Sequence, residues 1–455
     1  MLKINYYGVL EENVGAHGIS LKELENYKDL AKTAINSIYN VRANKMLGWI
    51  DLPDTDKKLL DEINTVATSI RNNFDNFVVL GIGGSALGTK ALYQAFAKKH
   101  KAMSKQIYCT VCDNIDPDTF VTLLNELDLN KTMFNVITKS GGTSETLIQM
   151  RLVIDLYNKA GIDYKEHFIV TTESGNKLDA FAKANGIPTF EVPKSVGGRF
   201  SVLSPVGLLP ASVYGIDIAG LMKGADNIRQ SAKNEDITSN LTMLSALINY
   251  ISYEKGKNEL VFMPYSDTLA LMTDYFAQLW AESLGKEVDL DGKVVNHGQV
   301  PIKTVGVTDQ HSQLQLYEEG PNNKIFTFLG VENPLIDMTT SSESPIEGYD
   351  YLNNLSIKRL LDLEQHCTAY ALIKQDRPNY TLTLTQVDEE NVGELMYYMQ
   401  MLTAFMGEFL HIDTYNQPGV EQGKIYAKAL LNVEGFEAQK KEIEDYTAKS
   451  KKYEF

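Results

Sequence analysis

Two glycine-containing segments of this 455-residue sequence carry the residue types that bind phosphate groups. Residues 79–88 read V-L-G-I-G-G-S-A-L-G, and residues 138–146 read T-K-S-G-G-T-S-E-T. Each segment follows a short apolar run and leads into an amphipathic stretch, so each is expected to join a strand to the start of a helix. Backbone N–H groups at a helix N-terminus attract anions, most often phosphate.

The first segment by itself allows three interpretations. Gly81, Gly83 and Ala86 fit the dinucleotide fingerprint G-x-G-x-x-A, with Asp113 at the end of the next expected strand as a ribose ligand. Alternatively, the glycines and Ser85 bind one phosphate of a small ligand. The third interpretation is an ordinary tight turn between strand and helix. The pattern alone does not choose among them.

The second segment favours a small phosphorylated ligand. It offers several hydroxyls, backbone amides next to two glycines, and one cation, Lys139. A phosphate monoester has three exposed oxygens and needs donors from several directions, whereas a dinucleotide needs no such hydroxyl-rich loop two strands along. A Ser/Thr-rich helix start with no ligand is the plain alternative. Together the two loops predict a sugar-phosphate pocket at the carboxyl ends of the strands.

From residue 77 onward, short apolar runs alternate with amphipathic stretches, which predicts βαβ units and parallel sheets. The expected strands are residues 77–80, 107–112, 134–138, 167–170, 189–192, 259–263, 304–307, 325–329 and 380–386. The expected helices include 86–98, 144–158 and a stretch around 227–251 that separates the two sets of strands. Residues 339–344 are expected to form a loop, and the Met- and Tyr-rich stretch 396–406 a buried helix rather than a cofactor site.

The N-terminal part is expected to be helical. Ser20 and Glu23 form a capping box for one long helix whose apolar positions continue to Ile38, and a second helix is expected over residues 59–70. The predicted fold class is therefore α/β, with two doubly wound parallel sheets and helical extensions at both ends.

The composition excludes several classes of protein. The sequence is 44% hydrophobic and 22% charged, and its 43 Lys and Arg against 59 Asp and Glu give a net charge of −16. Such a surface repels nucleic acid and anionic lipid, so neither is expected as a partner. No apolar run reaches the roughly 20 residues that span a membrane, and the first residues lack a signal-peptide pattern. We therefore expect a cytoplasmic protein.

Three cysteines are too few for a disulfide framework. Cys109 and Cys112 form a C-x-x-C pair, but positions i and i+3 of the expected strand face opposite sides of a sheet. No second cysteine pair completes a tetrahedral zinc site. We interpret both as small core residues.

Four further segments narrow the interpretation to one family. Residues 196–204 read V-G-G-R-F-S-V-L-S, 280–286 read W-A-E-S-L-G-K, 306–315 read G-V-T-D-Q-H-S-Q-L-Q, and 407–424 read G-E-F-L-H-I-D-T-Y-N-Q-P-G-V-E-Q-G-K. Together with the two loops they resemble, in order along the chain, the motifs of phosphoglucose isomerases, in a bacterial form. The resemblance implies an N-terminal helical segment (1–70), two sugar-isomerase domains (71–226 and 227–430) and a C-terminal helix (431–455).

The resemblance also implies an activity, the interconversion of glucose 6-phosphate and fructose 6-phosphate through a cis-enediol. In the family's pattern, Glu282 matches the base that moves a proton between C2 and C1, and Arg199 the arginine that stabilises the developing negative charge. His311 matches the histidine that opens the sugar ring, with Lys424 assisting near the ring oxygen. The position of Glu282 beside Trp280 and Leu284 suggests partial desolvation, which strengthens a carboxylate as a base.

Further positions match the family's contacts with substrate. They are Gly84, Ser85, Thr138, Lys139, Ser140, Thr143, Glu145 and Gln417. No metal or redox cofactor is expected, since the electrons move within the substrate. In the family the histidine comes from a neighbouring subunit, so the resemblance implies a homodimer or a higher homo-oligomer.

Three alternatives stay open. The first is an isomerase of the same fold acting on mannose phosphate or on more than one epimer, and the second is a non-catalytic sugar-phosphate sensor. A sensor needs the two loops but not Glu282, Arg199 or Lys424, so the presence of all three favours an enzyme. The third is a nicotinamide dehydrogenase, for which a change in nicotinamide absorbance or fluorescence on mixing is the simple test.

Overall fold

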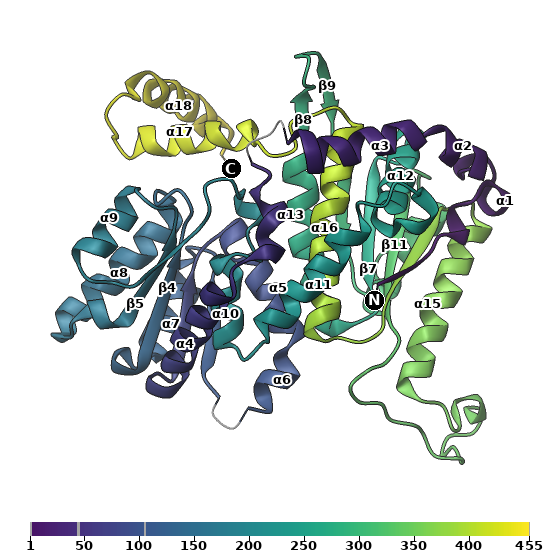
Figure 1. The fold of residues 1–455 in the computed structure, drawn as a ribbon, viewed down its shortest axis with the longest axis horizontal. Helices are drawn as coiled ribbons and strands as arrows, with labels where there is room; N and C mark the ends of the chain where they lie inside the picture. Colours follow the sequence, from purple (N-terminus) through teal and green to yellow (C-terminus); the bar gives the residue numbers. More distant parts are fainter. Residues whose placement is uncertain (1, 43–45, 104–105, 455) are drawn as a thin grey trace.

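The chain folds into two α/β halves (Figure 1). Between them lie helices α5 (Leu87–Ala95), α10 (Pro205–Val213), α11 (Ile218–Ser231), α13 (Met272–Leu284) and α16 (Glu389–Phe409). The computed structural model describes residues 2–42, 46–103 and 106–454. The first sheet has the strand order β3-β2-β4-β5-β6, and all its strand pairs are parallel. Its strands are β2 (Asn76–Leu80), β3 (Tyr108–Cys112), β4 (Thr132–Ile137), β5 (Phe168–Thr172) and β6 (Thr189–Glu191). The five strands expected in this half are confirmed.

The second sheet has the order β1-β12-β11-β7-β10. Strands β7 (Glu259–Pro264), β10 (Val300–Lys303), β11 (Lys324–Val331) and β12 (Asn379–Leu384) are parallel. The strand expected over residues 304–307 is wrong, because the strand that pairs with β7 precedes it. Sequence reasoning also missed β1 (Lys3–Asn5), which joins the sheet edge antiparallel to β12, and the hairpin β8 (Lys286–Val288) and β9 (Val294–His297).

The helices cover both sheets and fill the space between them. They are α1 (Glu11–Val14), α2 (Leu21–Asn26), α3 (Lys28–Asn36), α4 (Lys57–Asn73), α5 (Leu87–Ala95), α6 (Ala97–Lys101), α7 (Pro117–Glu126), α8 (Ser144–Ala160), α9 (Lys177–Ala184), α10 (Pro205–Val213), α11 (Ile218–Ser231), α12 (Leu241–Glu254), α13 (Met272–Leu284), α14 (Leu314–Glu319), α15 (Ile357–Lys374), α16 (Glu389–Phe409), α17 (Glu421–Leu430) and α18 (Glu437–Ser450). Among the described residues, no helix is both long enough and apolar enough to cross a membrane.

Three expected helical stretches are each divided in the structure. The stretch around 227–251 covers the end of α11, a 3₁₀ turn at Ile237–Ser239 and most of α12. The capping box is confirmed, since the Ser20 hydroxyl accepts the Glu23 N–H at 3.0 Å, but the helix ends at Tyr27 and α3 begins after it. The Tyr27 ring packs edge-on against Tyr250, with ring centroids 5.8 Å apart, so tertiary packing accompanies the break. The helix expected over residues 86–98 is divided in the same way at Phe96.

The stretch 396–406 lies in α16, the helix at the centre of the molecule. Its side chains are buried along almost its whole length, which confirms the prediction of a core helix. The two cysteines of C-x-x-C are half-buried and free. Cys109 packs against the central core and Cys112 against the core of the first half, so they face opposite sides of the sheet as expected. Burial raises the pKa of both thiols to about 12, which keeps them protonated.

Two segments extend from the body. Residues 332–356, between β11 and α15, form a long arm (Figure 1) that contains the expected loop 339–344. At the other side α17 and α18 form a helical hairpin. The C-terminal helix expected over residues 431–455 corresponds to the connection after α17 followed by α18.

Candidate active site

The two predicted phosphate loops lie side by side. Strands β2 and β4 are adjacent and parallel, with Leu80 opposite Val136, so the loops that follow them leave the same edge of the sheet. A Cβ atom added to Gly81 would lie 3.3 Å from the carbonyl oxygen of Ile137. The two loops therefore begin at the same edge of the sheet, and the sugar-phosphate pocket there stays a prediction.

The second loop presents hydroxyls at an uncapped helix start. The hydroxyls of Thr138 and Thr143 are 2.8 Å apart. Although Thr143 is the N-cap residue of α8, its side chain makes no capping bond, which leaves the first amides of α8 without this partner. The Thr146 hydroxyl in the first turn is buried without a hydrogen-bond partner among the described residues. This arrangement suits an anion.

The other residues of this loop differ in how they are placed. Ser140 is exposed, and Glu145 is half-buried in the first turn of α8. The Lys139 ammonium donates to the carbonyl of Lys194 at 2.8 Å, and burial lowers its pKa from the usual value. The side chain of Lys139 therefore connects the loop to the segment that contains Lys194, and its ammonium lies at the outer edge of the loop.

The first loop contacts the segment that carries Arg199. A Cβ atom added to Gly84 would lie 2.3 Å from the carbonyl carbon and oxygen of Gly198 and 2.7 Å from the Arg199 nitrogen. Only glycine permits this approach, so Gly84 brings the loop and the adjacent Ser85 against the arginine. The dinucleotide interpretation loses its ribose ligand, because the Asp113 carboxylate is paired with Lys90 at 2.7 Å.

Arg199 is the centre of the site. It lies in a 3₁₀ turn, Gly198–Phe200, and is 4% exposed. Its Nε donates to the Ser283 hydroxyl at 2.7 Å, Nη1 to Gln417 Oε1 at 3.0 Å, and Nη2 to the Thr414 carbonyl at 2.6 Å. Burial lowers the pKa of the guanidinium, and the nearby Glu282 carboxylate acts in the opposite direction. A fixed cation therefore joins three segments distant in sequence.

Glu282 lies beside this cation. One carboxylate oxygen is 3.6 Å from Arg199 Nη1, and the side chain is 25% exposed. The other oxygen accepts a hydrogen bond from Gln278 Nε2 at 3.1 Å, one helical turn earlier on α13. The same Nε2 atom would lie 3.0 Å from a Cβ atom added to Gly83. A partly solvated carboxylate thus stands between a buried arginine and the first loop.

Sequence reasoning missed two residues of this group, Ser283 and Gln278. A signal was available for both: Ser283 directly follows the expected base, and Gln278 is four residues before it, on the same helical face.

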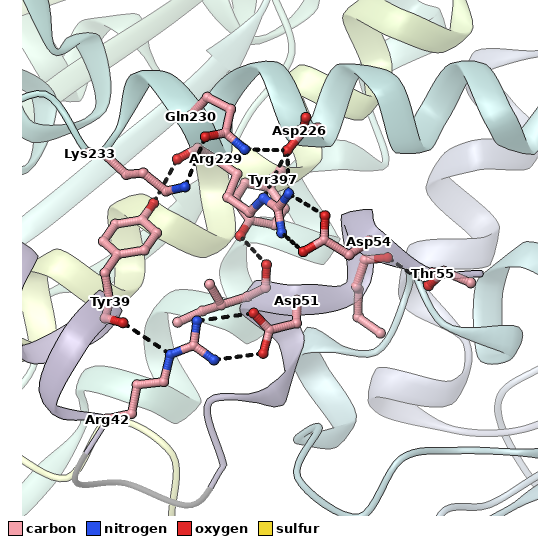
Figure 2. Close-up of polar contacts among 12 residues, drawn as sticks. Tyr39, Arg42, Asp51, Asp54, Thr55, Asp226, Arg229, Gln230, Lys233 and Tyr397 are labelled. Carbon is pink, nitrogen blue, oxygen red and sulfur yellow. Dashed lines mark hydrogen bonds and ion pairs between the residues drawn. The ribbon is translucent and has the colours of Figure 1, made fainter. Parts of the chain in front are cut away.

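A network of charged groups supports the turn that carries Arg199. Figure 2 shows Arg229 of α11 held by Asp54 and Asp226, while Arg42 is paired with Asp51. Hydrogen bonding to Arg229 lowers the pKa of the Asp54 carboxyl. The 3₁₀ segment Gly48–Asp54 that these ion pairs hold also carries Trp49, whose ring stacks on Phe200 at 4.9 Å. The network therefore anchors the packing next to Arg199.

A cavity of about 410 Å³ opens beside Gln417, and its lining extends to Glu421 of α17. Lys424 lies on the same helix and is exposed, with its ammonium 2.8 Å from the Glu421 carboxylate. Within the described ranges, no hydrogen bond or ion pair joins Lys424 to Arg199 or Glu282. The structure therefore brings Gln417 to Arg199 but leaves Lys424 outside this group.

His311 is also separate from the group. It ends a 3₁₀ turn, Thr308–His311, and is exposed, and its ring makes no hydrogen bond to another described residue. In residues 2–42, 46–103 and 106–454, no cluster of three or more His, Cys, Asp or Glu side chains could hold a metal ion. The side chains and backbone that the structure brings together are a partly exposed carboxylate, a buried guanidinium and two glycine-containing loops.

The fold and the arrangement of these residues define a class, α/β proteins with two doubly wound sheets and a cluster of polar groups at the carboxyl edge of the first sheet. Residues 51–333 match the family model of phosphoglucose isomerase. Over 97% of both chains, the sequence is 40% identical to a glucose-6-phosphate isomerase of Carboxydothermus hydrogenoformans. The chain belongs to the phosphoglucose isomerase family.

Solved structures share the fold. A Thermus thermophilus protein described as hypothetical superposes with a TM-score of 0.86 and 34% identity, covering 95% of this chain and all of that one. A glucose-6-phosphate isomerase of Chlamydia trachomatis superposes with a TM-score of 0.84 at 23% identity, covering 98% of this chain and 92% of that one. The predicted α/β fold class is confirmed.

Proposed function

We propose that this protein interconverts glucose 6-phosphate and fructose 6-phosphate, a step of glycolysis and gluconeogenesis, by proton transfer through a cis-enediol. The observation that carries the proposal is the contact of Glu282 with the buried Arg199 beside two phosphate-type loops. Aldose–ketose isomerisation needs a base that reaches two adjacent carbons and a fixed positive charge for the enediolate oxygen. Glu282 and Arg199 supply these two groups.

In this proposal the phosphate is bound by Ser85, Thr138, Ser140 and Thr143 together with backbone amides of the two loops, with Gly84 and Lys139 shaping them. Glu145 and Gln417 contact the sugar. In the direction from aldose to ketose, the Glu282 carboxylate removes the proton from C2 and returns it to C1, while the hydroxyl proton passes from the C2 oxygen to the C1 oxygen. Arg199 stabilises the negative oxygen while the proton is on Glu282. Lys424 acts near the ring oxygen, which requires its ammonium to leave Glu421 and turn toward the cavity beside Gln417.

The proposal includes a homodimer with His311 supplied by the partner subunit. Two observations support it. His311 is exposed, and in the described part of the chain no hydrogen bond or ion pair joins its ring to Glu282, so the proposed ring-opening histidine is not placed at the base of its own subunit. The arm 332–356 and the start of α15 expose large apolar side chains, including Ile336 at 72%, Met338 at 71% and Tyr351 at 73%. Apolar side chains gathered in this way mark an interaction surface.

We also place the protein in the cytoplasm as part of the proposal, because free thiols such as those of Cys109, Cys112 and Cys367 persist in a reducing compartment.

The decisive experiment is a coupled assay on the purified protein with fructose 6-phosphate and no added metal. We expect glucose 6-phosphate to form, and the rate to survive prolonged treatment with a chelator, because no step of the proposal uses a metal ion. Loss of activity on chelation, with recovery on adding zinc or manganese, would overturn the metal-independent mechanism. Turnover of mannose 6-phosphate in the same preparation would show a broader specificity.

A second prediction concerns the phosphate loops. Replacing Ser140 and Thr143 together by alanine should raise KM strongly and lower kcat less, because each lost hydrogen bond to a charged group costs about 1.5–3 kcal/mol. The matched control is T33A/T65A, which removes two exposed hydroxyls that bond only to their own helices. Steady-state kinetics with fructose 6-phosphate measures both. A double variant that binds sugar phosphate as tightly as the control would assign the loop another role.

A further inference from the structure

A buried lysine closes the last turn of α13, the helix that carries Glu282. Lys286 is the first residue of β8 and is 7% exposed. Its ammonium donates to the carbonyl oxygens of Glu282 at 2.9 Å and Ser283 at 2.7 Å. The last carbonyls of a helix have no partner within the helix and need one from elsewhere when they are buried. Lys286 provides that partner for two of them.

These two carbonyls belong to the residues that meet Arg199. The Ser283 hydroxyl accepts from Arg199 Nε, and the Glu282 carboxylate is 3.6 Å from Nη1. A single ammonium therefore fixes the backbone from which both contacts to the arginine extend. If the turn relaxed, both contacts would change together, because Glu282 and Ser283 are consecutive.

The charge of Lys286 also matters at this place. The C-terminus of a helix carries partial negative charge, which disfavours a carboxylate on its last turn, and a cation at that end offsets the effect. The charged groups around Lys286 are Arg199, Asp413 and Glu282, and its backbone pairs with that of His297 on β9. Burial and the charge of Arg199 lower the pKa of Lys286 to about 8, so the ammonium is present at and below neutral pH.

We propose that Lys286 is a positioning residue of the isomerase: its ammonium locks the last turn of α13, which holds Glu282 and Ser283 against Arg199, and offsets the partial negative charge at that end of the helix. Lys286 touches no reacting atom and acts through Glu282. The inference rests on the proposed function, since it takes Glu282 as the base.

The test compares K286Q, K286R and K286M across pH. Glutamine keeps a hydrogen-bond donor but loses the charge, arginine keeps the charge, and methionine removes both. For K286Q and K286M, we expect the acidic limb of the kcat profile to move up by about one pH unit and kcat at pH 7 to fall about tenfold, with KM changing little. K286R should restore the acidic limb. The control is K293M, which removes an exposed lysine of the same hairpin and should leave the kcat profile unchanged.

The pH range in which the variants should differ from the wild type follows from the charge of Lys286. Since its pKa is about 8, wild-type Lys286 carries its charge below that pH and loses it above. The difference in kcat between the wild type and K286Q should therefore be largest below pH 8 and should disappear above that pH. Circular dichroism establishes that each variant is folded, and if K286M does not fold, the pair K286Q and K286R decides.

Superimposable profiles for K286Q and wild type, or a K286R profile shifted like that of K286Q, would overturn the role of Lys286. These results leave the proposed function standing if E282Q is inactive. An E282Q protein with wild-type turnover would instead remove the proposed function itself.

Discussion

Glu282→Gln is expected to lower kcat by roughly 10²–10⁴-fold or more while the protein still binds sugar phosphate. A positioned base contributes about this factor, and the proposal assigns no second group to move the proton between the two carbons. Glutamine has nearly the shape of glutamate and keeps an oxygen that can accept from Gln278, so the packing on α13 should persist. Its neutral side chain cannot accept the substrate proton. Steady-state kinetics and a binding titration with fructose 6-phosphate separate the two effects.

Solvent deuterium gives a sharper measurement of the same prediction. In deuterium oxide the wild type should place deuterium on the exchanging carbon, since the protonated Glu282, 25% exposed, can trade its proton while the enediol waits. Glu282→Gln should lose exchange together with turnover. Gln278→Ala is the control: it removes one contact to the carboxylate but leaves the base, so exchange should continue. Exchange near the wild-type rate in Glu282→Gln would remove Glu282 from the mechanism, and Glu145 would be tested next.

The parallel strands other than β10 were predictable because each is a short apolar run between turn residues. The strand β10 was misplaced because its residues, 300–303, are only half-buried or exposed. Their sequence is therefore less apolar than that of residues 304–307, where the strand was expected. β1 has only three residues and joins the sheet from the far end of the chain. Neither the hydrophobic periodicity of a segment nor its strand propensity predicts a pairing between segments so far apart in the sequence.

The site was predictable in its residue types and not in its contacts. The two glycine loops could be brought together from the rule that parallel strands end at one edge. By contrast, the approach of Gly84 to Gly198 joins residues more than a hundred positions apart, and local sequence gives no sign of it. The salt bridge between Arg199 and Glu282 likewise depends on how α13 packs between the two halves. The family resemblance, and not the pattern alone, paired these residues.

Lys424 and His311 are the candidates that one chain does not bring to Glu282. The hairpin of α17 and α18 extends from the body (Figure 1). Lys424 lies on α17, and its ammonium pairs with Glu421 of the same helix. His311 is exposed on a turn in the second half. For both, the sequence motif indicates a role that a single subunit does not display. For His311, the proposed dimer turns this into an experiment.

Mixing two inactive variants should restore activity if His311 comes from the partner subunit. Glu282→Gln homodimers lack the base in both sites, and His311→Ala homodimers lack the ring-opening histidine in both. In a hybrid dimer, one site combines an intact Glu282 from one chain with an intact His311 from the other, while the second site lacks both. After full exchange of equal amounts, half of the dimers are hybrids, so about a quarter of the wild-type activity should return. The coupled assay follows the recovery of activity, and native mass spectrometry of one isotope-labelled variant measures the exchange of subunits.

Because ring opening is needed for the closed sugar, His311→Ala should also retain more activity on an open-chain substrate analogue than Glu282→Gln does. Hybrid dimers that form fully and remain inactive would mean that both residues act from one chain, which would require His311 to move to its own Glu282.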